Sequence, residues 1–151
     1  MKEFDIVVVA DTQVDINSPT DHLTAVGKYI WEHQPGAVVH IGDHWDFPAL
    51  SSYSSAQEAE GRRLVNDLRG GMDSLPLIMK ETRDRNVSGK RKVYAPEQHF
   101  LMGNHENRLN RYIAANPVLE GLIDIQEFIE SHGWEVSAMN DPVFILSLIH
   151  I

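Results

Sequence analysis

Residues 37–46, AVVHIGDHWD, decide the fold of this 151-residue chain. A mostly apolar run is closed by Gly42, and Asp43 and Asp46 follow directly. Such a run, bounded by a turn residue, is typical of a short strand inside a sheet. In parallel sheets, ligands bind beyond the carboxyl ends of the strands. The stretch therefore predicts a strand that ends in a functional polar cluster.

Residues 6–10, IVVVA, repeat this pattern and end at Asp11. The continuous β-branched run predicts a strand that is buried on both faces of a covered sheet. Between the two runs we expect a helix, with Ser18 as N-cap, Pro19 at the first helical position and a stop at residues 35–36. Strand, helix and strand in succession favour a parallel βαβ unit and an α/β fold.

A third strand is expected over residues 94–102, and it too ends in a polar cluster, GNHE at residues 103–106. The Gly70-Gly71 pair is expected to kink a long preceding helix, and Pro76 to bend or break it. The other elements that we expect are a helix over residues 57–84, a basic turn over 87–92, helices over 107–115 and 125–131, and a strand over 134–136.

Composition limits the classes of function. The chain has no cysteine, which excludes disulfides and thiolate metal sites, so any metal must be held by oxygen and imidazole ligands. The net charge of -9 disfavours nonspecific binding to a nucleic-acid duplex. The first apolar run is too short to span a membrane and has the wrong flanks for an export signal, so we expect no membrane contact and a cytoplasmic location.

The three strand ends each deliver polar side chains of the kinds that bind metals. Divalent cations require several oxygen or imidazole donors that converge on one point. Ends of parallel strands bring together residues that are distant in sequence, and glycines there let the backbone turn sharply. The side chains concerned are Asp11 with Gln13, Asp43 with Asp46, and Asn104 with His105.

These clusters resemble the motifs of the calcineurin-like metallophosphoesterases. Residues 42–46 match G-D-x-x-D, residues 103–106 match G-N-H-E, and residues 11–13 stand in the place of D-x-H. The order of the motifs agrees, and the resemblance covers roughly residues 4–136. Details in residues 45–63, and glutamine at the third position of the first motif, resemble the members encoded by tailed bacteriophages.

The resemblance implies an α/β/β/α sandwich, with two sheets packed face to face and helices outside. It also implies hydrolysis of a phosphate ester, either a diester or a monoester, by a dinuclear metal site and a hydroxide that bridges the two ions. Manganese is the first expectation for the metal, with iron, zinc and magnesium as alternatives. The substrate would be a phosphorylated small molecule or a nucleic acid, in the host cytoplasm for a phage protein. No stable protein partner is implied.

The same resemblance assigns the metal ligands. Asp43 would bridge the two cations, and Asp11 would bind the first of them. Gln13 would stand where the family has a histidine, and its amide oxygen is a weaker donor than imidazole. Asn104 would bind the second cation.

Other residues of the motifs would act on the substrate or support the ligands. His105 would lie over the phosphate and stabilise its charge or protonate the leaving oxygen. Asp46 and Glu106 would position the ligands and the histidine. Arg108 is a candidate contact to phosphate.

The chain departs from the family after its third motif. Two further histidine motifs are expected there, but only His132 and His150 follow His105, and neither stands in a G-H-x-H context. We therefore expect a single truncated domain with an incomplete second sheet and little activity alone. Residues 145–151 include a stretch that resembles translated adapter sequence, so we expect this tail to be non-native.

Several alternatives stay open from sequence. The chain could be a binding module that kept the fold and lost catalysis, or a protein phosphatase. Asp11 could be only a turn residue, and His44 could reach the substrate. Arg62 and Arg63 could bind phosphate or form a solvated helix face. The three tryptophans, Trp31, Trp45 and Trp134, are expected in the core.

Overall fold

The computed structural model describes residues 4–51, 61–89 and 93–145. Its sheet has four parallel strands in the order β1-β2-β3-β4. The strands are β1 (Ile6–Val9), β2 (Ala37–His40), β3 (Glu97–Leu101) and β4 (Glu135–Ser137). The expected α/β fold with parallel βαβ units is confirmed.

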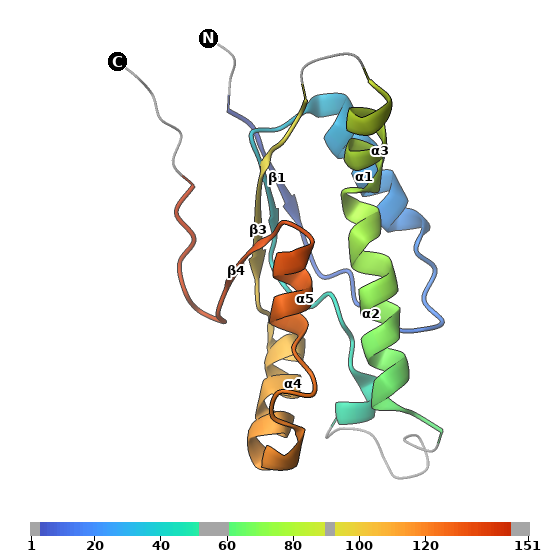
Figure 1. Cartoon of the computed structure of the whole chain (residues 1–151), viewed down its shortest axis with the longest axis vertical. Coiled ribbons are helices and arrows are strands. Elements are labelled where there is room, and N and C mark those ends of the chain that lie inside the picture. Colours follow the sequence, from blue (N-terminus) through green and yellow to red (C-terminus); the bar gives the residue numbers. More distant parts are fainter. Residues whose placement is uncertain (1–3, 52–60, 90–92, 146–151) are drawn as a thin grey trace.

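The helices of the described part lie on one face of this sheet (Figure 1). They are α1 (Asp21–His33), α2 (Leu64–Ile78), α3 (Lys80–Ser88), α4 (Asn104–Ala115) and α5 (Ile125–Ser131), with short 3-10 turns η1 (Pro48–Leu50) and η2 (Pro117–Leu119). Crossovers between parallel strands are right-handed, and the strand order here never reverses. Successive connections therefore fall on the same side of the sheet.

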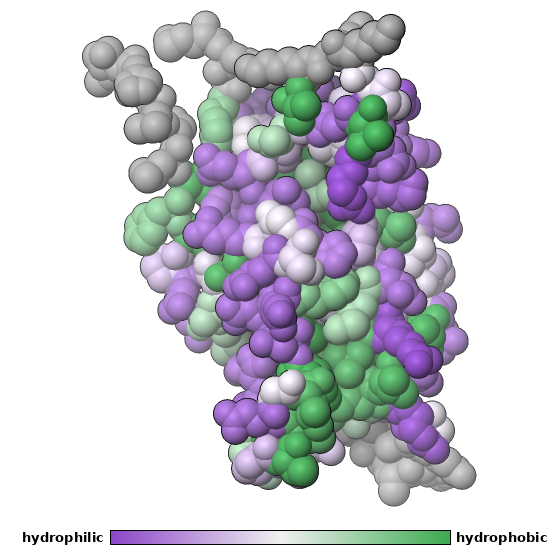
Figure 2. All heavy atoms as spheres, viewed as in Figure 1, coloured by the Kyte–Doolittle hydropathy of each residue, from purple (hydrophilic) through white to green (hydrophobic). Residues whose placement is uncertain are grey.

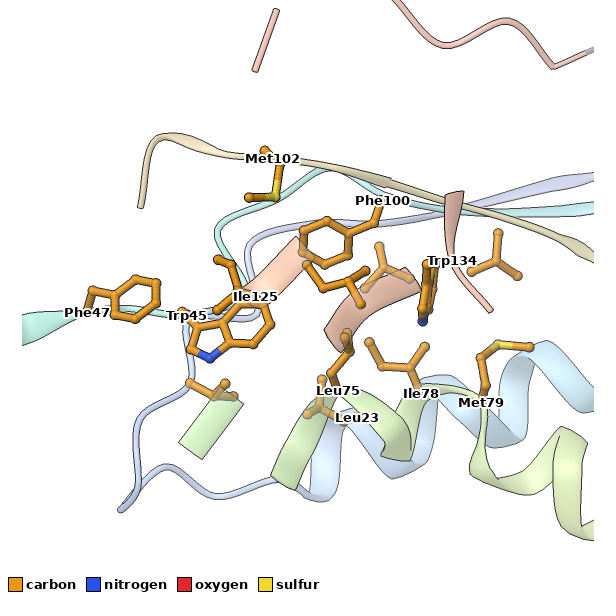
Figure 3. Packing of buried hydrophobic residues seen from close by; sticks show 14 of the residues in the cluster. Leu23, Trp45, Phe47, Leu75, Ile78, Met79, Phe100, Met102, Ile125 and Trp134 are labelled. Carbon is orange, nitrogen blue, oxygen red and sulfur yellow. The ribbon is translucent and has the colours of Figure 1, made fainter. Parts of the chain in front are cut away.

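The core fills the space between the sheet and these helices. Figure 3 shows Phe100 of β3 facing Leu75 and Ile78 of α2, with Trp45 and Trp134 on either side. All five are buried, and each large apolar side chain removed from water stabilises the fold by about 1.5–3 kcal/mol. The expected core positions of Trp45 and Trp134 are confirmed, whereas Trp31 is only partly buried.

The opposite face of β1 is not covered. Ile6 and Val8 are 46% and 59% exposed, and Ile41 just beyond β2 is 44% exposed. The prediction that the first strand is buried on both faces is therefore wrong. The second sheet that the family resemblance implies is not formed by the described residues, since their strands belong to one sheet.

Helix α1 begins later than expected. Its N-cap is Thr20 rather than Ser18, and Pro19 lies outside the helix. Ser18 instead closes a turn, where its hydroxyl accepts the Asp15 N–H at 2.9 Å and donates to the Asp15 carboxylate at 3.2 Å. A serine side chain can form such local bonds with the backbone instead of capping a helix. This explains why the Ser18-Pro19 pair does not mark the start of α1.

The Gly70-Gly71 pair does not interrupt α2, which runs unbroken through both residues. A Cβ on Gly71 would come within 1.9 Å of the Trp45 indole nitrogen, and one on Gly70 within 2.5 Å of the Asp15 backbone. The pair therefore lets the helix pack directly against the chain that follows β1 and β2. The helix ends at Ile78, two residues after Pro76, near the expected break.

The remaining boundaries differ modestly from expectation. The third strand is shorter than residues 94–102, and the fourth is shifted by one residue, while the helix over 125–131 agrees. Helix α4 begins at Asn104, so the third motif forms its first turn. Four predictions concern residues that the structure does not describe: the helix start at 57–60, the end of the basic turn at 90–92, part of the phage-like stretch at 52–60, and the tail at 146–151.

Figure 2 shows hydrophobic residues gathered toward the lower end of the molecule in this view, near the end of α4 and the start of α2. The exposed apolar residues here are Val118 and Leu122, which follow α4, and Val65, which lies at the start of α2. None of the described helices combines the length and the apolar character that crossing a membrane requires.

Candidate metal centre

The loops that follow β1 and β2 run side by side. The Gln13 N–H donates to the Asp43 carbonyl at 3.0 Å, and the Val14 N–H donates to the His44 carbonyl at 2.7 Å. The Asp46 N–H donates in turn to the Val14 carbonyl at 3.2 Å. Parallel pairing therefore continues past the strands and brings the first two predicted clusters together.

Glu106 ties the third cluster to the second. Its buried carboxylate accepts four backbone N–H groups, at 2.8 to 3.1 Å. These donors belong to Gly103, Asp43, His44 and Trp45. Burial raises the pKa of Glu106, and the N–H donors act against that rise. Because all four partners are donors, we assign the ionised, acceptor-only form.

Asp43 lies where the second and third clusters touch. Its Oδ1 accepts the His105 N–H at 2.9 Å. A Cβ on Gly103 would come within 2.2 Å of this oxygen, and a Cβ on Gly42 within 2.4 Å of the Gly103 nitrogen. These two glycines let the loops pack this closely, and the φ of 88° at Gly42 agrees with the sharp turn expected there.

The backbone of these loops is strained. Three residues without a glycine's freedom have positive φ here: Gln13 at 40°, Asp43 at 52° and Phe47 at 48°. Such conformations persist only where the surroundings hold them, and they concentrate at functional sites. The hydrogen bonds to the backbone of Gln13 and Asp43 supply this restraint.

The predicted ligands present oxygen donors at this edge. Asp11, Gln13 and Asn104 are exposed, and Asp43 is half-buried. Within the described ranges, the side chains of the three exposed residues make no hydrogen bond or ion pair. Carboxylate and amide oxygens suit hard cations such as Mg²⁺ or Mn²⁺. The residues thus fit a divalent-cation site chemically.

The carboxylate content of this set is low. Across residues 4–51, 61–89 and 93–145, no group of three or more His, Cys, Asp or Glu side chains is placed to hold a metal ion. The predicted set has two carboxylates, because Gln13 and Asn104 contribute neutral amides. The assignment of these four residues as ligands stays a prediction.

The three predicted catalytic residues are neighbours. Nδ1 of His105 lies 3.3 Å from Oδ1 of Asp46 but makes no hydrogen bond, and this buried nitrogen has no other partner among the described residues. Nη1 of Arg108 donates to the carbonyls of Asp46 and Phe47, at 3.2 and 3.4 Å. Arg108 therefore holds the loop of the second motif, and its contact to phosphate stays a prediction.

His44 does not reach the surface. It is fully buried, with Nδ1 bonded to Thr12 and Nε2 bonded to Gly71, so the idea that it contacts the substrate is wrong. His40 is equally buried. Burial lowers the pKa of His40 to about 3 and that of His44 to about 4, so both rings are neutral. The alternation in β2, which places His40 on the same face as Val38, is the signal that could have placed His40 inward.

A cavity of about 500 Å³ opens beside Asp46. Arg62 and Arg63 line it together with Asn66, and Nη1 of Arg62 donates to the Pro48 carbonyl at 3.2 Å. The acidic residues Asp15 and Asp67 also line it. The arginines thus lie near the predicted site, but the mixed charge of this cavity leaves both interpretations of them open.

Two curated relatives come from mycobacteriophages, and both carry the name Gene 54 protein. The one from Mycobacterium phage L5 is 32% identical over 138 residues, which are 89% of this chain and 50% of that protein. The one from Mycobacterium phage D29 is 31% identical over 108 residues, which are 72% of this chain and 38% of that protein. The chain thus spans half or less of each relative. No family model and no solved structure matches.

Proposed function

We propose that this chain carries the first part of the dinuclear metal site of a phosphate-ester hydrolase of the calcineurin-like metallophosphoesterase type. One observation carries the proposal. Three polar clusters from distant parts of the sequence are joined by direct hydrogen bonds at one edge of a parallel sheet, through the Gln13 and Asp43 backbones and the Glu106 carboxylate. The relationship to phage proteins agrees with the phage-like details of the second motif.

In this proposal Asp11, Gln13, Asp43 and Asn104 hold the cations. Bound divalent ions would neutralise charge on the phosphoryl oxygens and lower the pKa of water. Manganese is proposed first, as the family resemblance implies, and the oxygen donors suit it. Asn104 and His105 also open helix α4, whose amino end favours an anion such as phosphate.

His105 is the proposed proton donor to the leaving oxygen. Asp46 lies next to its Nδ1, and a small movement would form a hydrogen bond that orients the ring. Arg108, fixed to the loop carbonyls through Nη1, keeps other N–H groups for a phosphate oxygen. The proposed substrate is a phosphodiester or monoester of a small molecule or nucleic acid, in the host cytoplasm.

The uncovered face of β1 supports the second part of the proposal, a sandwich completed by a further sheet. Apolar Ile6, Val8 and Ile41 would be covered by such a sheet. The relatives are a little under twice as long as this chain, so they have room for it.

The test is hydrolysis of bis-p-nitrophenyl phosphate with and without Mn²⁺, by residues 1–151 and by the longest reading frame that contains them. Asp43→Asn keeps an oxygen for the His105 N–H and removes the charge, so turnover should fall to background. Asp73→Asn, an exposed position on α2, is the matched control and should keep full rate. Wild-type turnover by Asp43→Asn would refute the bridging role.

A binding module without catalysis is the second candidate, and the two neutral amides in the ligand set favour it. It would bind Mn²⁺ and a phosphate ester without turning the ester over. Calorimetric binding of a non-hydrolysable phosphonate, with no hydrolysis by the longer protein, would select it.

A further inference from the structure

A chain of buried polar side chains runs beneath the candidate ligands. The Thr12 hydroxyl oxygen lies 3.1 Å from Nε2 of His40 and 2.6 Å from Nδ1 of His44. Nε2 of His44 in turn lies 3.1 Å from both the Gly71 carbonyl and the Ser74 hydroxyl. The chain links the loop after β1, strand β2, the loop after it and helix α2.

The partners at the two ends of this hydrogen-bonded network determine which ring nitrogens of His40 and His44 carry a hydrogen. The Gly42 N–H can only donate, so Nδ1 of His40 accepts it at 3.1 Å and Nε2 carries the hydrogen. The Gly71 carbonyl can only accept, so Nε2 of His44 also carries its hydrogen. Thr12 must then accept from His40 and donate to His44. Only one arrangement satisfies all of these bonds.

Thr12 stands between two proposed metal ligands, Asp11 and Gln13. Neither of their side chains is held by other described residues. What holds this loop is its backbone pairing with the loop after β2, through Gln13 and Val14, and the hydroxyl of Thr12. On the far side, α2 comes close enough to bond His44 because Gly71 has no side chain.

We propose that Thr12 is a positioning residue, which pins the loop of residues 11–13 to His40 and His44 and thereby sets the place of the first metal's ligands. The part about the metal rests on the proposed function, whereas the pinning of the loop does not. A valine at this position has the same shape but no hydroxyl, and a serine keeps the hydroxyl. The two variants therefore separate the hydrogen bonds from the packing.

The first test uses the unmodified chain. Long-range ¹H–¹⁵N correlation spectra of its histidine rings should give the Nε2–H tautomer for His40 and for His44, and the Thr12 hydroxyl proton should exchange slowly enough to be observed. An Nδ1–H tautomer at either ring, or a freely exchanging hydroxyl, would overturn the proposal without any variant.

The second test measures amide hydrogen exchange of Gln13 and Val14. Thr12→Val should speed their exchange about tenfold, because the loop loses its buried hydrogen bonds, and Thr12→Ser should return it to near the original rate. The Met102 amide, bonded to the Ser137 carbonyl, is the internal control and should not change. Equal exchange in Thr12→Val and the original chain would refute the pinning.

The third test addresses the metal. Residues that orient ligands typically change metal affinity 10–100-fold, so Thr12→Val should weaken Mn²⁺ binding about tenfold or more and Thr12→Ser should restore it. Unchanged Mn²⁺ affinity in a folded Thr12→Val would refute the positioning role. If neither the original chain nor the longer reading frame binds Mn²⁺, the proposed function fails, while the exchange result still decides whether Thr12 pins the loop.

Discussion

Three histidines lie close to the carboxyl ends of the strands, and they fall into two kinds. His40 and His44 are fully buried, with both ring nitrogens bonded to protein groups. His105 lies at the rim, and its Nδ1 has no hydrogen-bond partner among the described residues. Unused bonding capacity therefore distinguishes a histidine available for chemistry from those that hold the loops. Four predictions can break or sharpen this contrast.

The largest effect is expected at His105. His105→Gln should lower the rate of ester hydrolysis about 10²–10⁴-fold, the usual contribution of a general acid, because the proton for the leaving oxygen is lost. Metal-dependent turnover by the active form measures it. The exposed His33→Gln is the control and should leave the rate unchanged. Full activity in His105→Gln would show that His105, like His40 and His44, has no part in the chemistry.

Glu106→Gln should lower the free energy of unfolding by about 3 kcal/mol, because four backbone N–H groups then face an amide instead of a buried carboxylate. Urea unfolding measures the loss. Glu120→Gln, on an exposed side chain, should cost almost nothing. A loss below about 0.5 kcal/mol at Glu106 would mean that this carboxylate does not hold the clusters together.

Gly71→Ala tests whether the close packing of α2 supports the buried histidines, His40 and His44. Its Cβ would meet the Trp45 indole nitrogen at 1.9 Å, so α2 must move away from the loop that carries His44. Overpacking of this kind costs about 1–3 kcal/mol. Thermal unfolding measures the loss, and histidine ring spectra report whether His44 is disturbed. A variant as stable as the original chain would show that the close packing of α2 is dispensable.

The last prediction concerns the pH dependence of stability. The pKa values of His40 and His44 are lowered to about 3 and about 4, so below pH 6.5 the unfolded chain binds protons that the folded chain does not. Stability should therefore fall as pH decreases from 6.5 toward 5, by up to about 1.4 kcal/mol per pH unit for each ring. The raised pKa values of Asp67 and Glu106 act in the opposite direction.

Urea unfolding at several pH values measures this slope. Replacing the exposed His33 by Asn should leave the slope unchanged, whereas His40→Asn should reduce it. An equal slope in His40→Asn and in the original chain would contradict the neutral, buried state of this ring.

The sheet and the meeting of the three clusters were predictable from sequence because both depend on local patterns. Apolar runs that end in glycine or aspartate mark the strands, and parallel strands place their carboxyl ends at one edge. The exposure of one face of β1 was not predictable, because a continuous β-branched run has the same sequence pattern whether one face of the strand or both faces are covered.

The buried network escaped prediction for a different reason. Thr12, His40 and His44 belong to three segments, and their hydrogen bonds depend on how closely α2 approaches. That approach depends in turn on Gly70 and Gly71, which sequence alone presents as a weak point in a helix. Glu106 was expected to support the site, but its role as acceptor for both motif loops required the structure.

The most direct test of the metal centre is a crystal structure grown with Mn²⁺ and measured at a wavelength where manganese scatters anomalously. We expect anomalous peaks about 2.0 to 2.6 Å from the Asp43 carboxylate and from oxygens of Asp11, Gln13 and Asn104, the usual range for oxygen ligands of divalent cations. Absence of manganese from this edge of the sheet at saturating Mn²⁺, or its binding elsewhere on the chain, would contradict the proposed centre.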